Sequence, residues 1–165
     1  MAKRTTTQSG ERYLQPGWFT QHVVNGGIGR LARLGLAPKG LRQLAVRGRA
    51  TGEWKTVPVN LLELDGHRYL VAPRGLTQWV RNIRVAGGGE LRLGRSVEPI
   101  AVTELADGDK PVVLREYVRA WKSEVKAWFE GIDETSSDDE LLAIAAGFPV
   151  FEVYSARPTG SPSMS

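Results

Sequence analysis

The sequence contains no cysteine and only two histidines, His22 and His67. Without cysteine, the chain can form neither a disulfide nor a thiolate metal site. The two histidines lie far apart, and neither has other metal ligands at a suitable spacing. His67 directly follows a predicted turn, which indicates a surface position. We therefore expect no metal site.

Long apolar runs are also missing: no stretch approaches the ~20 residues that a membrane-spanning helix needs. The first twelve residues are polar and lack the apolar core of a signal peptide. We expect a cytoplasmic protein with no transmembrane segment. Apolar residues at helical spacing predict helix over 17–34, in one piece or two. This helix leaves three options open: packing on the chain's own domain, pairing with another subunit, or contact with a membrane surface.

Familiar catalytic motifs are absent, since the chain has no G-x-S-x-G, Walker A or H-E-x-x-H sequence. The glycines at 26–29 do not follow a predicted strand, so they do not indicate a dinucleotide-binding loop. The net charge is +4 and the pI is near 9.6. This mild surplus suits a solvated surface or an anionic small molecule. We expect no nucleic-acid partner, which would require a steep salt dependence of binding.

The chain is organised as one domain, 13–155, between two polar tails, 1–12 and 156–165. Strands are predicted over 41–47, 55–64, 67–72, 90–93, 97–105 and 149–154. The Asp65–Gly66 pair is a strong signal for a tight hairpin. Tight hairpins count against a doubly wound parallel sheet, whose strands need long crossover connections. The sequence therefore predicts an α+β protein: a mainly antiparallel barrel with flanking helices.

Three further helices are predicted, over 76–86, 109–129 and 137–146. The second carries one apolar stripe, which predicts a buried Trp121 and a core position for Trp128. Asp109 is its expected N-cap and Gly131 its expected C-terminal glycine. Ser136 or Ser137 is expected to cap the third.

Two local features interrupt the predicted elements. Pro58 lacks a backbone N–H, so it places strand 55–64 at an edge or bulge. The run Gly87–Gly89 ends helix 76–86 and is expected to be a flexible connection.

Basic and small residues gather in three segments, 47–58, 72–75 and 78–82. Arginine, threonine hydroxyls, turn amides and a helix N-terminus near Leu76 together suit an anion. An ordinary charged hairpin beside a helix is the alternative interpretation of the same residues.

The runs RGRATGEWKTVPVNLL, DGHRYLVAPRG and QWVRNIR, in that order, resemble the core of the deazaflavin-dependent nitroreductase family. The resemblance covers about residues 41–105, with weaker agreement towards the C-terminus. It implies a split β-barrel of the FMN-binding-like type and the cofactor coenzyme F-420, an 8-hydroxy-5-deazaflavin. It also implies hydride transfer to a small-molecule acceptor.

The resemblance implies a set of cofactor-binding residues. The phosphate and polyglutamate tail would lie at Arg49, Ala50, Thr51 and Lys55. The deazaflavin edge would lie along Thr56, Val57, Pro58, Val59 and Asn60. A second wall would come from Ala72, Pro73 and Arg74, and the site would be closed by Gln78, Trp79, Val80, Arg81 and Asn82. No catalytic side chain is assigned.

Four positions depart from the family pattern. Ala50 stands where a basic residue is common, and Lys55 stands where arginine is frequent. Lysine keeps the positive charge for a phosphate but cannot form the two parallel hydrogen bonds of an arginine. Asn60 replaces a tyrosine of some relatives, and Pro73 replaces a serine. These last two changes count against nitroimidazole reduction but not against cofactor binding.

Three functions are consistent with these residues. The first is an F-420-dependent reductase acting on a quinone, an activated alkene or a nitro compound. For this function, Trp121, Trp128 and Phe129 either line the acceptor side or, as their helical spacing favours, belong to the core. The second is a protein that carries F-420 without turnover. The third is an FMN-binding enzyme on the same barrel. The sequence leaves the physiological acceptor and the oligomeric state open.

Overall fold

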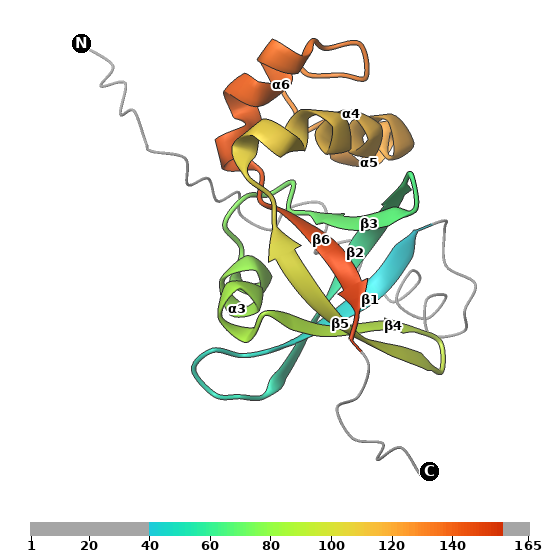
Figure 1. Cartoon of the computed structure of the whole chain (residues 1–165), viewed down its shortest axis with the longest axis vertical. Helices are drawn as coiled ribbons and strands as arrows, with labels where there is room; N and C mark the ends of the chain where they lie inside the picture. The colour runs from blue at the N-terminus through green and yellow to red at the C-terminus, as the bar shows by residue number, and fades with distance from the viewer. Residues whose placement is uncertain (1–39, 157–165) are drawn as a thin grey trace, which may run out of the picture.

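The computed structural model describes residues 40–156. The predicted helix over 17–34, the tail 1–12 and residues 157–165 of the other tail lie outside the described residues. Figure 1 shows a β-barrel with one group of helices at its upper end and a separate helix at its side.

Six antiparallel strands close into a barrel in the order β1-β2-β3-β6-β5-β4. The predicted α+β split β-barrel with flanking helices is therefore confirmed. The strands are β1 (Leu41–Arg47), β2 (Trp54–Leu64), β3 (His67–Val71), β4 (Gly88–Leu93), β5 (Ser96–Glu104) and β6 (Val150–Ser155).

The predicted Asp65–Gly66 turn joins β2 to β3, and Leu64 pairs with His67 across it. Both turn residues have positive φ, 51° for Asp65 and 78° for Gly66. This backbone matches the right-handed twist of the paired strands, which is why Asp-Gly favours two-residue hairpins. The hairpin prediction is confirmed.

The glycines before β4 were expected to form a flexible connection, and this prediction is wrong. Gly87 ends the preceding helix in the left-handed conformation, while Gly88 and Gly89 already pair within the barrel. A Cβ on Gly88 would lie 2.1 Å from the Ile100 carbonyl oxygen, and one on Gly89 would lie 2.2 Å from the Ala45 carbonyl oxygen. Only glycine permits this close approach of neighbouring backbones.

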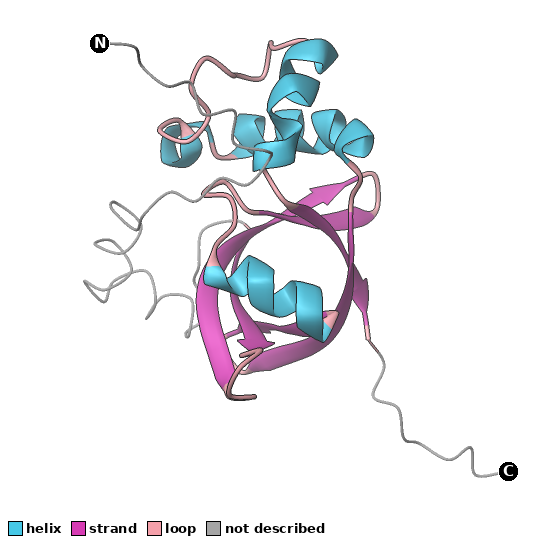
Figure 2. Ribbon diagram, turned by 90° about the vertical axis from the view of Figure 1, so that its left-hand side faces the viewer, coloured by secondary structure: helices cyan, strands magenta, loops and turns pink. Residues whose placement is uncertain are grey.

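The helices are α3 (Gln78–Ala86), α4 (Lys110–Ala120), α5 (Lys122–Val125) and α6 (Asp138–Ile144), with short 3-10 turns at Asp107–Asp109 and Ala145–Gly147. In Figure 2, α3 lies in front of the opening of the barrel, and the other helices form a layer above it. None of the helices in the described part is long and apolar enough to cross a membrane.

The prediction of one helix over 109–129 is wrong, because the helix breaks at Trp121 (φ −126°, ψ 34°). Trp121 is half-buried rather than buried, and its ring lies against Tyr117 and the backbone of Gly40. Asp109 precedes α4 but makes no side-chain capping bond. Gly131 has a left-handed φ of 71°, but it lies in the loop beyond the end of α5.

The cap of α6 is confirmed at Ser137. Its hydroxyl accepts from the Glu140 amide at 3.2 Å, and the Glu140 carboxylate accepts from the Ser137 amide at 2.7 Å. This reciprocal pair is a capping box, and it fixes the start of α6.

Two apolar cores result. The barrel core joins residues of the strands to Val80 and Ile83 of α3. The second core lies under the helical layer and includes Leu114, Tyr117, Trp128 and Leu141.

Candidate functional site

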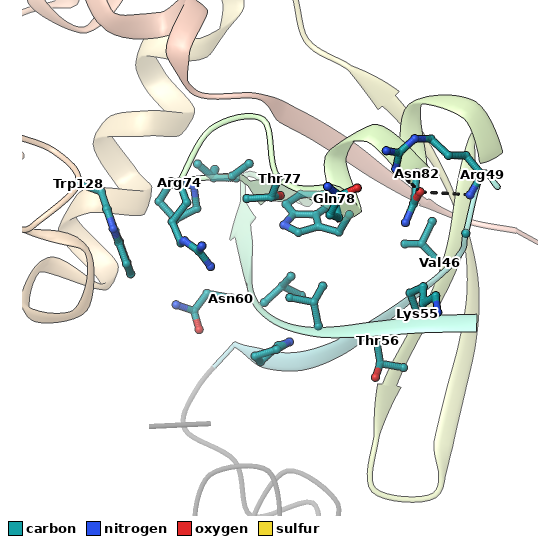
Figure 3. Close-up of a pocket in the computed structure, with 18 of the residues that line it drawn as sticks. Val46, Arg49, Lys55, Thr56, Asn60, Arg74, Thr77, Gln78, Asn82 and Trp128 are labelled. Carbon is teal, nitrogen blue, oxygen red and sulfur yellow. Dashed lines mark hydrogen bonds between the residues drawn. The ribbon is translucent and has the colours of Figure 1, made fainter. Parts of the chain in front are cut away.

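A cavity of about 550 Å³ opens beside the first half of β2. Residues 54–60 of β2 pair with β1, whereas pairing with β3 begins at Leu61. Among the described strands, this half of β2 therefore has one neighbour and an open edge. Pro58 lies in this half, as its missing N–H predicted. The cavity occupies the split, between the β1–β2 hairpin, the turn after β3 and α3 (Figure 3).

All the predicted site residues except Val80 and Arg81 line this cavity. Val80 is fully buried in the barrel core, and Arg81 lies exposed on α3. Because an α-helix completes one turn every 3.6 residues, only some residues of the segment 78–82 can face the cavity. The structure thus brings together three blocks that are separate in the sequence.

Six residues that line the cavity are not among the expected cofactor-binding residues: Val46, Gly48, Val71, Thr77, Tyr117 and Trp128. Gly48, Val71 and Thr77 each adjoin an expected residue in the chain, and Val46 lies nearby on β1. Tyr117 and Trp128 come from the helical layer and also belong to its core. The sequence left two positions open for Trp128, the core and the acceptor side of the site, and in the structure it belongs to the core and also lines the cavity. No local signal pointed to Tyr117 at the cavity.

The end of the cavity near the β1–β2 turn carries two cations. Both the backbone amide and the Nη1 of Arg49 donate to the Asn82 Oδ1, at 3.2 and 2.8 Å. The Lys55 ammonium lies 3.5 Å from the Glu53 carboxylate, and both side chains are largely exposed. Asn82 thus fixes the position of Arg49, while the guanidinium keeps further N–H donors for an anion.

The opposite end of the cavity lies near Trp128, with Arg74 and Asn60 (Figure 3). The Asn60 Nδ2 donates to the Glu124 Oε2 at 3.1 Å. Burial raises the pKa of the Tyr117 phenol far above its usual value, and its hydrogen bond with Asn60 opposes this shift only in part. The phenol therefore stays protonated, and it joins the helical layer to the barrel at this end.

Between the two ends, the walls are mostly apolar. Val57, Val59, Ala72 and Trp79 line this part, and the Trp79 ring packs on Phe151 with 5.8 Å between ring centroids. Apolar walls with a few fixed polar groups are typical of small-molecule sites. The arrangement suits a flat ring with an anionic tail, because Arg49 and Lys55 lie together at the mouth and the walls beyond them are apolar.

His67 lies away from this cavity, at the exposed position that the sequence predicted. Its Nδ1 is 2.6 Å from the Glu152 Oε1. Within residues 40–156, no group of three His, Asp or Glu side chains is placed to hold a metal ion.

The chain is thus a split β-barrel protein with an elongated cavity at the open edge of β2. No protein-family model matches it, and no curated protein matches it. Among solved structures, a protein of unknown function from Agrobacterium tumefaciens is 16% identical to this chain, with a TM-score of 0.51. The match spans 86% of this chain and 57% of the other protein. A domain-swapped dimer is 18% identical, with a TM-score of 0.50, covering 81% of this chain and 98% of its own.

An F420-H2-dependent reductase is also similar, at 18% identity and a TM-score of 0.49, over 70% of this chain and 94% of its own. At these identities, the likenesses with TM-scores of at least 0.50 show the fold and not the activity.

Proposed function

We propose that this protein is a reductase that uses coenzyme F-420 to reduce a small electron-poor acceptor: a quinone, an activated alkene or a nitro compound. One observation carries the proposal. A single cavity joins two cations, Arg49 and Lys55, to an apolar middle and an aromatic far end. F-420 likewise joins an anionic tail to a planar deazaflavin ring.

The size of the cavity supports the same cofactor. Its volume of about 550 Å³ lies within the range of roughly 300–1,000 Å³ typical of cofactor and ligand sites. Arg49 and Lys55 are exposed at its mouth, so the tail can extend into solvent while its anionic groups bind them. The residues present therefore fit F-420.

Each group of side chains has a role in this proposal. Arg49 and Lys55 bind the tail, and Asn82 holds Arg49 in place. Val57, Val59 and Trp79 enclose the ring and exclude water from it. When bound, F-420 supplies a hydride from its C5 carbon, so the chain needs no nucleophile of its own.

The end near Trp128 is left for the acceptor. Arg74 offers positive charge there, and the protonated Tyr117 phenol offers a hydrogen-bond donor. Electron-rich oxygens form when a quinone or nitro group is reduced, and donors fixed in advance stabilise such charge.

Titration of the cofactor-free protein with F-420 and with FMN, followed by fluorescence, tests the cofactor. We expect F-420 to bind at least ten times more tightly than FMN. Tight binding of FMN with none of F-420 would replace the proposal with an FMN enzyme.

Turnover is tested separately, by following the absorbance of reduced F-420 after menadione is added. We expect its oxidation to depend on the protein. Tight binding of F-420 with no oxidation by quinone, alkene or nitro acceptors would instead identify a carrier protein.

A further inference from the structure

Among the described residues, every charged side chain that lines the cavity is a cation. The lining includes Arg49, Lys55 and Arg74, and it includes no aspartate or glutamate. Arg49 and Lys55 lie at the mouth, where the proposed function assigns them to the cofactor tail. Arg74 lies at the other end, near Trp128, so the tail does not account for it. A cleft lined by charges of one sign attracts ligands of the opposite sign.

The backbone fixes the place from which Arg74 reaches the cavity. Arg74 lies in the turn between β3 and α3, where the Gly75 amide donates to the Ala72 oxygen at 3.1 Å and the Thr77 amide donates to the Gly75 oxygen at 2.8 Å. Figure 3 shows the guanidinium directed from this turn into the cavity, above the Asn60 amide. Arg74 is half-buried, and a guanidinium can bind a carboxylate through two parallel hydrogen bonds.

The wall beside Arg74 is polar but carries no charge. Asn60 is 7% exposed, and its Nδ2 donates to the Glu124 Oε2 at 3.1 Å. Glu124 belongs to α5 and does not line the cavity, so Asn60 separates its carboxylate from the space for a ligand. An anion that enters this end therefore contacts a cation and a neutral amide.

We propose that the acceptor carries a carboxylate, which Arg74 binds. The inference rests on the proposed function and narrows it to the acidic members of the acceptor classes. The hydride is delivered to the electron-poor part of the acceptor, and the carboxylate takes no part in the reaction. Arg74 is thus the residue that determines specificity at this end of the cavity.

A matched pair of compounds tests the charge: a naphthoquinone with a propionate side chain, and the methyl ester of the same compound. Saturated carbons separate the acid from the ring, so the two quinones accept a hydride about equally well. Each is titrated by calorimetry into protein loaded with oxidised F-420, which cannot reduce it. We expect wild-type protein to bind the acid about ten- to a hundredfold more tightly than the ester, the value of a charge-assisted hydrogen bond.

Arg74→Gln removes the charge and should make the protein bind the acid and the ester equally, with an unchanged affinity for F-420. Arg74→Lys should keep part of the preference, because an ammonium retains the charge but cannot form two parallel hydrogen bonds. Arg95→Gln is the matched control, since Arg95 is exposed in the β4–β5 turn and does not line the cavity. It should keep the full preference of the wild type.

Turnover with reduced F-420 gives a second measurement. We expect Arg74→Gln to raise KM for the acid and to leave KM for the ester almost unchanged. An equal loss of kcat for both compounds, with KM unchanged, would mean that Arg74 acts only on charge that forms during reduction, and would overturn the inference.

Three results of the titration also overturn the inference: equal binding of the acid and the ester by wild-type protein, a preference that Arg74→Gln leaves intact, or weaker F-420 binding by Arg74→Gln. The last result would assign Arg74 to the cofactor ring. In each case, oxidation of reduced F-420 by the wild type leaves the proposed function standing.

If wild-type protein binds FMN and not F-420, the proposed function fails, and the same titration is made on protein loaded with FMN. A preference for the acid that Arg74→Gln abolishes then upholds the inference, and equal binding overturns it. Wild-type protein that binds F-420 without reducing either quinone, or that binds neither cofactor, overturns both.

Discussion

Arg49 is held at the mouth of the cavity by two hydrogen bonds to one oxygen of Asn82. A charge-assisted hydrogen bond to an anion is worth roughly 1.5–3 kcal/mol. We therefore expect Arg49→Ala to weaken F-420 binding by about ten- to a hundredfold. Lys55→Ala should cost less, because an ammonium cannot form a bidentate fork. Fluorescence titration at fixed ionic strength measures both.

Arg95→Ala is the control for these two variants. Arg95 is an exposed cation in the β4–β5 turn and does not line the cavity. It should leave the affinity almost unchanged. Equal small losses for all three variants would mean that the net charge of +4 steers the anion diffusely, with no built site.

At the residue scale, the sequence was most informative where the cavity is built from neighbouring residues. The segments 49–60 and 72–82 carry small and basic residues whose chemistry is visible without a structure. Thr77 lies between the predicted segments 72–75 and 78–82 and was missed, since a threonine before a helix is typical of an ordinary cap. Tyr117 and Trp128 reach the cavity only through the packing of the helical layer on the barrel.

The first residues of β4 are a sensitive point of the barrel. A Cβ on Gly89 would lie 2.2 Å from the Ala45 carbonyl oxygen, a backbone atom that cannot move aside without disturbing β1. We expect Gly89→Ala to lower the free energy of unfolding by about 3 kcal/mol. Urea denaturation followed by tryptophan fluorescence measures the loss.

Gly108→Ala is the matched control, because a Cβ there meets nothing within 4 Å. It should change stability by less than about 0.5 kcal/mol. A similar small effect for Gly89→Ala would show that β4 does not pack this closely on β1.

An ion pair and one hydrogen bond connect side chains of β3, β5 and β6. Both terminal nitrogens of Arg68 on β3 donate to the Glu98 carboxylate on β5, each at 2.8 Å, and the Ser155 hydroxyl on β6 donates to the same carboxylate. The hydrogen bond from Arg68 is the main cause that lowers the pKa of Glu98. A carboxylate whose pKa is lowered by folding stabilises the protein above its unfolded pKa and loses that contribution as the pH falls through its folded pKa.

Glu98→Gln should therefore lower Tm at about pH 7 by roughly 1–4 °C, a small effect because both side chains are partly exposed. The difference from wild type should shrink as the pH falls below about 4, where the wild-type carboxyl becomes protonated. Calorimetry across this range measures it. A difference that stays constant with pH would mean that the Glu98 charge does not contribute.

Elements marked by turns could be predicted, whereas the break in the helix 109–129 could not. Asp65–Gly66 and the Ser137–Glu140 capping box act through the backbone of a few adjacent residues. At the break, the Trp121 ring packs on Gly40 and Tyr117, which are contacts that the local sequence does not reveal, and the apolar stripe continues through the break. Periodicity alone therefore indicates one helix where the structure has two.

At the scale of the whole molecule, the cavity spans both apolar cores. Asn60 and Ala72 reach it from the barrel, and Tyr117 and Trp128 from the helical layer. A bound ligand should therefore stabilise both together. At a hundred times its Kd, F-420 should add about 2.7 kcal/mol, a rise in Tm of roughly 5–10 °C in one transition. Two separate transitions, with only one shifted, would contradict this coupling.

The cavity draws its two ends from different parts of the chain, which has an evolutionary consequence. The cationic mouth lies on one hairpin and α3, whereas Tyr117 and Trp128 come from the segment between β5 and β6. Mutations, insertions or deletions in that segment can change which molecules enter beside Trp128 and leave the cationic mouth intact. Under the proposed function, a lineage of such proteins can therefore change the acceptors that it reduces while its cofactor-binding residues stay the same.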